Sequence, residues 1–489
     1  MKHFSRTAVP VVLASLALVV IVVGVQATGI LSWPADGIPV IKAAYDQVAP
    51  RVISDGVGGV IVVWEDKRSY GAGSGDIYAQ RLNASGQVLW ETTGVTVSAA
   101  AAQQRLPALT SDGEQGAIMA WQDRRNLLGY NDVYAQRILS DGTAAWISQG
   151  ITISIVEGDQ DYVCVAADGD GGAVLAWEDS RSGDRADIYA QRISSDGSVQ
   201  WAANGVQVGR AATNTESALP VIVPDGNGGA LIAWKNTDEN NHSDVWAQHV
   251  LSNGVAAWEE QGINVSAQGK ADSPTMIPDG NGGAIVAWYG TLAGSNYGIF
   301  AQRLSANGST SWGSGGITLE VGIAIDPHIV SDGAQGALIA WPAYPTLTPS
   351  NTVSIVRIQH VISNGAFAWT TPGITVSVSS AQQLLRLVDD GSAGAIIVGK
   401  AMTYTQGKYD SSLWGQRIDA TGAKQWASEG ISIAQHIGDF NQFVAASDMN
   451  HGAIVVWTDQ RYTTDSDLYA QRISDFTATA WVYLPLVRR

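Results

Sequence analysis

Short apolar runs that end in tryptophan recur along the chain, and a turn signal precedes each of them. The segment at residues 172–177 reads Gly-Ala-Val-Leu-Ala-Trp and is continuously apolar, a pattern typical of a strand covered on both faces. An Asp-Gly pair, or Asp-Met in the last copy, comes before each run and is typical of a tight hairpin. The aspartates of these pairs are Asp55, Asp112, Asp168, Asp225, Asp279, Asp332, Asp390 and Asp448.

Successive turn aspartates lie 53 to 58 residues apart, a period that suits the four-stranded blade of a propeller. Each unit predicts an inner strand before the aspartate, the apolar strand, a strand around a segment like Asp-Ile-Tyr-Ala-Gln-Arg, and a last strand near a second tryptophan. We therefore predict an all-β chain that forms a single eight-bladed β-propeller over residues 28–481. Its repeats start near residues 49, 106, 162, 219, 273, 326, 384 and 442.

A second set of tryptophans lies four residues after one glycine and four residues before another. Each can bury about 150–250 Å² and so hold neighbouring blades together. The set comprises Trp90, Trp146, Trp201, Trp258, Trp312, Trp369 and Trp426. The last repeat lacks the following glycine, whereas Trp33 near the N-terminus has the expected spacing. We therefore expect residues 30–45 to supply the closing strand of the eighth blade, which removes a free sheet edge.

Two resemblances follow from these units. Residues 418–426, Ile-Asp-Ala-Thr-Gly-Ala-Lys-Gln-Trp, resemble the tryptophan-docking motif of eight-bladed quinoprotein-type propellers. The whole unit, including DIYAQR at residues 187–192, resembles the repeats of secreted bacterial β-propeller proteins of poorly defined function, over residues 30–481. The resemblance implies the fold and secretion. Quinone-dependent dehydrogenases of this class use a pair of neighbouring cysteines and a metal, whereas Cys164 is the only cysteine here, so no quinone cofactor is expected.

The N-terminal segment of the chain predicts export. Lys2 and Arg6 precede an uncharged run over residues 8–25, and small residues follow at a cleavage point after Ala27. This is the pattern of a signal peptide over residues 1–27, with an uncleaved anchor as the alternative. Residues 482–489 form a C-terminal tail. We expect an extracellular or cell-surface protein, a monomer that has no membrane partner once the signal is cleaved.

Charge narrows the choice of partners. The formal net charge of −17 disfavours nucleic acid, because proteins that bind phosphate backbones carry basic faces. Asp168 and Asp170 flank a glycine in one turn, as in calcium loops, but calcium needs six to eight oxygen ligands. We interpret this segment as a turn and leave calcium open. No cofactor, metal site or catalytic residue is assigned.

A Trp-x-Asp-x-Arg motif follows the apolar strand in four of the eight repeats. These repeats become neighbours once the ring closes. Because a catalytic site needs one asymmetric set of residues, a motif repeated in blade after blade favours a structural charge network. Its residues are Asp66, Arg68, Asp123, Arg125, Asp179, Arg181, Asp459 and Arg461.

The remaining repeats carry tyrosines in the equivalent loops. Loops on one face of a propeller are common binding positions, and tyrosine offers an apolar face with a polar tip. The candidate ligand-binding residues are Tyr289, Tyr297, Tyr344, Tyr404 and Tyr409. We predict a non-catalytic binding module for an extracellular glycan or protein. The alternative is a polysaccharide-acting enzyme, which requires converging carboxylates. The non-repeated candidates for these are Glu239, Glu259, Glu260 and Glu320.

Overall fold

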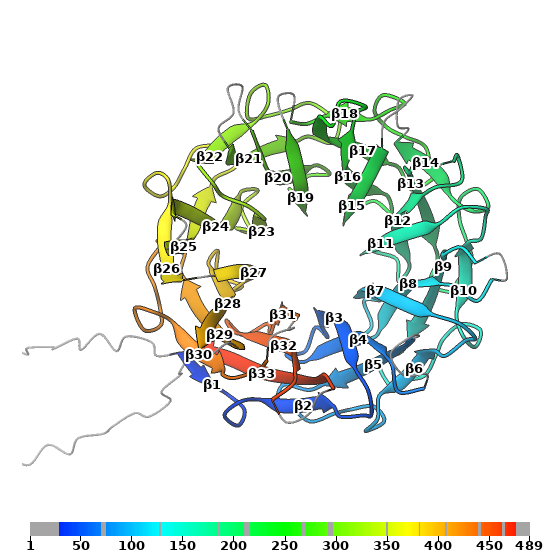
Figure 1. Cartoon of the computed structure of the whole chain (residues 1–489). Helices are drawn as coiled ribbons and strands as arrows, with labels where there is room; N and C mark the ends of the chain where they lie inside the picture. The colour runs from blue at the N-terminus through cyan, green and yellow to red at the C-terminus, as the bar shows by residue number, and fades with distance from the viewer. Residues whose placement is uncertain are drawn as a thin grey trace, which may run out of the picture.

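The chain forms a ring of eight antiparallel blades around a central axis, which confirms the predicted eight-bladed β-propeller (Figure 1). The computed structural model describes residues 29–69, 75–126, 129–183, 185–209, 216–266, 270–291, 297–348, 351–380, 382–405, 408–438, 442–461 and 465–475. No helix occurs in these ranges. In each blade the first strand lies nearest the axis and the last lies at the rim.

The first four blades follow one another along the chain. Blade 1 holds β3 (Gln47–Ser54), β4 (Val60–Asp66), β5 (Asp76–Leu82) and β6 (Val95–Ser98). Blade 2 holds β7 (Gln104–Ser111), β8 (Ala117–Asp123), β9 (Asp132–Ile138) and β10 (Ile151–Ser154). Blade 3 holds β11 (Gln160–Ala167), β12 (Ala173–Asp179), β13 (Asp187–Ile193) and β14 (Val206–Gly209). Blade 4 holds β15 (Glu216–Pro224), β16 (Ala230–Thr237), β17 (Ser243–Val250) and β18 (Ile263–Asn264).

The next three blades repeat this order. Blade 5 holds β19 (Ala271–Pro278), β20 (Ala284–Thr291), β21 (Tyr297–Leu304) and β22 (Ile317–Val321). Blade 6 holds β23 (His328–Ser331), β24 (Ala337–Thr348), β25 (Asn351–Val361) and β26 (Ile374–Ser380). Blade 7 holds β27 (Gln382–Asp389), β28 (Ala395–Thr405), β29 (Lys408–Ile418) and β30 (Ile431–Ala434).

The eighth blade joins the two ends of the described chain. It combines β31 (Phe443–Ser447), β32 (Ala453–Asp459) and β33 (Asp467–Asp475) with the N-terminal strands β1 (Gly29–Leu31) and β2 (Ile38–Ile41). Both N-terminal strands pair antiparallel with β33, and Ile38 lies opposite Ala470. Figure 1 shows the blue N-terminal strands beside the red β33. Pairing between chain ends closes the ring, so that this edge of β33 is not left open.

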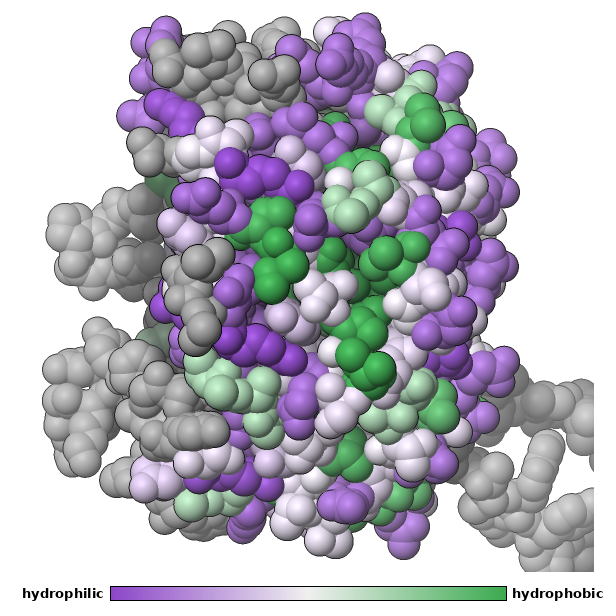
Figure 2. All heavy atoms as spheres, turned by 90° about the vertical axis from the view of Figure 1, so that its right-hand side faces the viewer, coloured by the Kyte–Doolittle hydropathy of each residue, from purple (hydrophilic) through white to green (hydrophobic). Residues whose placement is uncertain are grey.

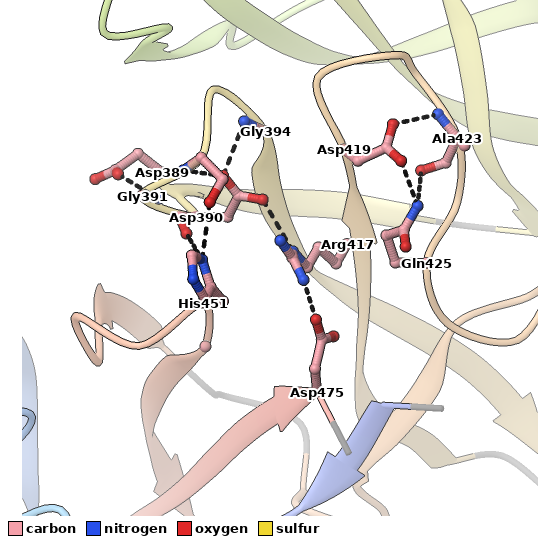
Figure 3. A network of polar contacts seen from close by, with 12 residues as sticks. Asp389, Asp390, Gly391, Gly394, Arg417, Asp419, Ala423, Gln425, His451 and Asp475 are labelled. Atoms are coloured by element: carbon pink, nitrogen blue, oxygen red, sulfur yellow. Dashed lines mark hydrogen bonds and ion pairs between the residues drawn. The ribbon is translucent and has the colours of Figure 1, made fainter. Parts of the chain in front are cut away.

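The turn aspartates explain why the Asp-Gly and Gln-Arg pairs recur together. In blade 1, Asp55 accepts a hydrogen bond from the Gly59 amide at 2.8 Å and forms an ion pair with Arg81 at 2.9 Å. Equivalent pairs occur in every blade, with His249 and His360 in place of arginine in blades 4 and 6. Figure 3 shows the blade 7 pair, in which Arg417 bridges Asp390 and Asp475.

Tryptophans at the rim connect each blade to the next. The Trp90 indole N–H donates to the Ser140 carbonyl of blade 2 at 3.0 Å, and its ring packs against Gly142, where an added Cβ would lie 2.8 Å from the ring. Gln80 accepts a hydrogen bond from the Trp90 amide and orients it. Trp146, Trp201, Trp258 and Trp312 make the same contacts with the blades that follow them.

The outer wall of the ring is mostly polar but not uniformly so. Figure 2 shows one side of this wall, where a broken line of apolar side chains runs among hydrophilic ones. Exposed apolar residues of blades 2 to 4 include Ile147, Val199 and Val255. Single exposed apolar side chains are normal on protein surfaces, so these residues do not by themselves mark a binding site.

Candidate functional site

A cavity of about 720 Å³ lies along the axis of the propeller. Its wall comes from the innermost strands β3, β7, β11, β15, β19, β27 and β31. Most of the lining side chains are apolar, among them Leu109, Val165 and Val221. Cys164 also lines it, and burial raises the pKa of its thiol to about 12, so this thiol stays protonated and unreactive.

The innermost strands share a bulge near their first residues. In six blades the residue six positions before the turn aspartate has a positive φ although it is not glycine. These residues are Ala49, Leu106, Tyr162, Leu219, Ser273 and Asp326, with φ between 43° and 54°. Such a conformation costs about 1–3 kcal/mol and is retained where the surrounding structure imposes it. Of these residues, Leu106, Tyr162, Leu219 and Ser273 line the axial cavity.

Three blades break the repeat with ionisable residues at these positions. Blade 6 carries Asp326 at the positive-φ position, just before β23, and His328 two residues later, whereas blades 7 and 1 carry Arg386 and Arg51 at the position of His328. The same position in the other blades holds a small or apolar residue: Ala108, Cys164, Val221, Thr275 and Val444. One arc of the channel wall therefore holds a set of ionisable groups that occurs once in the ring.

A second cavity of about 290 Å³ lies against this arc, and Asp326, His328 and Arg386 all line it. Burial, and then the positive charge of Arg386, lowers the pKa of His328 to about 3. Its imidazole is therefore neutral, and it has no hydrogen-bond partner in the part of the chain that the structure describes. Burial, and then the charge of Asp272, raises the pKa of Asp326, while Arg386 opposes this shift.

Two of the five predicted tyrosines, Tyr289 and Tyr344, lie within electrostatic reach of Asp326. Burial, and then the charges of Asp272 and Asp326, raises the pKa of Tyr289, and Tyr297 adds to this effect. Burial and Asp326 likewise raise the pKa of Tyr344. The phenols of Tyr289 and Tyr344 are therefore protonated at neutral pH. Tyr404 and Tyr409 face each other across β28 and β29 as backbone partners, but their side chains lie outside the described part.

Lys235 and Asp272 form an ion pair beside this arc at 2.5 Å. They belong to adjacent blades, since Lys235 lies on β16 and Asp272 on β19. The negative charge of Asp272 acts on both Tyr289 and Asp326. The Asp272 carboxylate of this ion pair therefore contributes to the electrostatics of the arc.

The Trp-x-Asp-x-Arg residues form self-contained networks away from both cavities. The buried Asp66 accepts hydrogen bonds from the Trp64 indole at 2.8 Å and from Arg68 Nε at 2.8 Å. The Arg68 guanidinium lies over the Tyr78 ring at 4.2 Å. The other three copies have the same contacts, through Asp123 and Arg125, Asp179 and Arg181, and Asp459 and Arg461. Each aspartate has its acceptor atoms engaged.

The four glutamates named as candidate catalytic acids do not converge. None of them lines either of these cavities. Glu320 accepts a hydrogen bond from the Trp341 indole at 3.3 Å and lies 3.4 Å from Arg357. Glu259 and Glu260 are exposed after the rim tryptophan of blade 4. Sequence reasoning missed Asp326, His328, Arg386 and Arg51, although aligning the eight repeats position by position would have revealed them as exceptions.

The described residues contain no group of three or more histidine, cysteine, aspartate or glutamate side chains suited to a metal ion. In the same ranges there is no helix with the length and hydrophobicity of a membrane span.

No protein-family model matches this chain, and no curated protein sequence is significantly similar to it. Solved structures are similar. An ulvan lyase, which is a polysaccharide lyase, has 11% identity and a TM-score of 0.45, and the match covers 90% of this chain and 94% of that one. The polysaccharide lyase Uly1 has 9% identity and a TM-score of 0.41, with 75% and 89% covered. An endo-arabinase from Bacteroides thetaiotaomicron has 13% identity and a TM-score of 0.28, with 53% and 93% covered.

These comparisons contradict the prediction of a non-catalytic binding module. The similar structures include polysaccharide lyases and an endo-arabinase, which are enzymes, so the binding module is not proposed again and the alternative, a polysaccharide-acting enzyme, is taken up below as a proposal. At 9–13% identity the likeness concerns the fold alone. The residues and substrates of those enzymes are therefore not carried over, and the chemistry has to be argued from this chain's own site.

Proposed function

We propose that this chain is a polysaccharide-acting enzyme with its active site on the arc formed by Asp326, His328, Tyr289 and Tyr344. One observation carries the proposal. In a ring of eight similar blades, ionisable groups that occur only once line the same cavity. Repeated residues serve all blades alike, whereas a reaction needs a single asymmetric set of groups held in one place.

The protonation states on this arc suit acid–base chemistry on a sugar. Asp326 has a raised pKa, which brings a carboxyl group closer to the pH at which it can both give and take a proton. His328 is neutral and, with a pKa of about 3, is a weak base, so its role here is to accept a hydrogen bond from a bound sugar. Tyr289 and Tyr344 keep their protons and can donate to glycosidic or hydroxyl oxygens. Their rings also offer apolar faces to a pyranose.

Longer strands raise one side of the channel mouth at this arc. The hairpin of β24 and β25 has strands of 12 and 11 residues, and that of β28 and β29 has 11 in each, compared with 7 in β4 and β5. Blades 6 and 7 therefore extend beyond their neighbours next to Asp326 and Arg386. A raised wall beside an open channel suits a long polymer that lies across the mouth rather than a small enclosed substrate.

Turnover of a polysaccharide panel tests this proposal. The full chain is incubated with neutral and acidic polysaccharides, and products are measured as new reducing ends and as the ultraviolet absorbance of unsaturated sugars. Asp326→Asn should lower turnover by about 10²–10⁴-fold, the usual contribution of a positioned acid or base. Asp161→Asn is the matched control, because Asp161 lies one residue before the bulge of blade 3 and accepts a hydrogen bond from Asn131. Unchanged turnover in Asp326→Asn would refute the assignment.

The proposal also includes the location of the protein, which we propose is exported from the cell. The signal pattern over residues 1–27 and the resemblance of the repeats to secreted propeller proteins support an extracellular monomer that acts on a glycan. The signal peptide and the tail at 482–489 lie outside the described residues. Calcium stays a hypothesis that a chelator arm in the same turnover assay would test.

A further inference from the structure

Two arginines line the axial cavity without a carboxylate partner in the described residues. Arg51 lies on β3 and Arg386 on β27, and both contribute to the wall of the 720 Å³ cavity. Each guanidinium donates a hydrogen bond to the backbone carbonyl of the residue before it, Arg51 to Pro50 at 3.0 Å and Arg386 to Leu385 at 2.6 Å. By contrast, the repeated arginines of the turns and of the Trp-x-Asp-x-Arg motif are each paired with an aspartate.

The two arginines share one level of the channel. Both occupy the position four residues before the turn aspartate, in blades 7 and 1, with Val444 of blade 8 between them. The charge of Arg51 acts on Arg386 and, after burial, contributes to lowering its pKa to about 10. Two like charges held near each other in a partly dehydrated channel destabilise the protein. Such an arrangement is typical of a site whose ligand supplies the opposite charge.

The two arginines form a positive site in a chain whose overall charge is negative. The protein carries a net charge of −17, so a general attraction for anions is not expected. Asp326 acts on Arg386 across the smaller cavity, but no ion pair joins the two among the described residues. Arginine binds carboxylates and sulfated groups in a planar fork that places two parallel hydrogen bonds.

We infer that Arg51 and Arg386 form a subsite for the anionic group of an acidic polysaccharide, a carboxylate or a sulfate ester. This inference rests on the proposed function, because it places the charged sugar in the channel next to Asp326 and His328. It narrows the substrate class from polysaccharides in general to acidic ones. Neutral glycans lack the group that would balance the two guanidinium charges.

Binding to matched polymers tests the subsite separately from turnover. The full chain is titrated with polygalacturonate and its carboxyl-reduced neutral form, and with dextran sulfate and dextran. We expect binding to at least one anionic polymer and little to its neutral counterpart, with affinity that falls as salt rises. The pair that shows the difference identifies the carboxylate or the sulfate ester as the ligand. Equal binding to charged and neutral members of both pairs would overturn the inference, as would a complete absence of binding.

Variants assign the effect to the two arginines. Arg386→Gln and Arg51→Gln should each weaken binding of the anionic polymer by about tenfold or more, as expected for a charge-assisted hydrogen bond. Arg386→Lys should retain part of the affinity, because lysine keeps the charge but not the planar fork. Arg105→Gln is the matched control, since Arg105 lies on the innermost strand β7 without lining the cavity and donates to Gln122 at 3.1 Å. Thermal unfolding confirms that each variant folds.

The two proposals fail in different ways. Arginine-dependent binding without turnover on any acidic polymer would support the subsite and contradict the enzyme. Turnover of a neutral polysaccharide that survives both arginine substitutions would support the enzyme and contradict the subsite.

Discussion

Removal of one rim tryptophan should measure how strongly two blades are held together. Trp90 is only 7% exposed and packs between blade 1 and Gly142 of blade 2. A tryptophan buries about 150–250 Å², which at about 25 cal/mol per Å² is worth about 4–6 kcal/mol. The indole also donates to the Ser140 carbonyl, a hydrogen bond with a net value of about 1 kcal/mol. Since the cavity relaxes in part, Trp90→Ala should cost about 3–5 kcal/mol.

Urea unfolding monitored by circular dichroism and by tryptophan fluorescence gives the free energy of unfolding. Trp90→Phe separates packing from hydrogen bonding, because it keeps most of the ring area and loses the N–H, so its cost should be clearly smaller. Trp258→Ala is a useful comparison, since Trp258 makes the same carbonyl contact but is less buried, and should cost less than Trp90→Ala. A loss below about 1 kcal/mol for Trp90→Ala would refute the role of the rim tryptophans in holding the blades.

Two further predictions concern pH. Burial opposes ionisation of Asp225, but hydrogen bonds from His249 and from the Asn227 and Gly229 amides outweigh burial and lower the pKa of this carboxyl group. The ionised Asp225 therefore stabilises the folded state at pH values above its ordinary pKa of 3.8, and this contribution is lost as the pH falls through the lowered pKa. Asp225→Asn should flatten this acid limb in urea unfolding at a series of pH values, and an unchanged limb would contradict the pairing. Burial raises the pKa of Glu178 to about 7, although the Leu219 amide opposes the shift, so stability should fall as pH rises from about 4.5 to 7. Glu178→Gln should remove this decline, whereas a decline of the same size in the variant would show that other groups cause it.

The residues of the candidate site are difficult to recognise in a sequence made of repeats. The Trp64-x-Asp66-x-Arg68 motif recurs and is the most polar motif of the chain. Its side chains nevertheless bond to one another, and both carboxylate oxygens of Asp66 are engaged as acceptors. Asp326 and Arg386 occupy positions where most of the other blades have uncharged residues, and they stand out only when the repeats are compared position by position. Their meaning depends on which blades become neighbours around the axis.

The sequence by itself determined the number of blades and the four strands of each. This is possible because each blade of fewer than 60 residues contains its own turn aspartate, apolar strand and tryptophan, so the pattern is local and repeats along the chain. The sequence predicted Tyr289 and Tyr344 in loops, whereas both lie on strands, in β20 and β24.

Only the tertiary structure decided which residues share a cavity. Arg51 and Arg386 are far apart in the chain, and the closure of the ring by β1, β2 and β33 sets them at one level of the same channel. The physical reason is that the charge environment of a side chain depends on distance through space, and a ring brings together positions on blades that the linear order separates. The axial cavity, the neutral state of His328 and the presence of both arginines on one channel wall therefore follow from the assembled propeller and not from any single repeat.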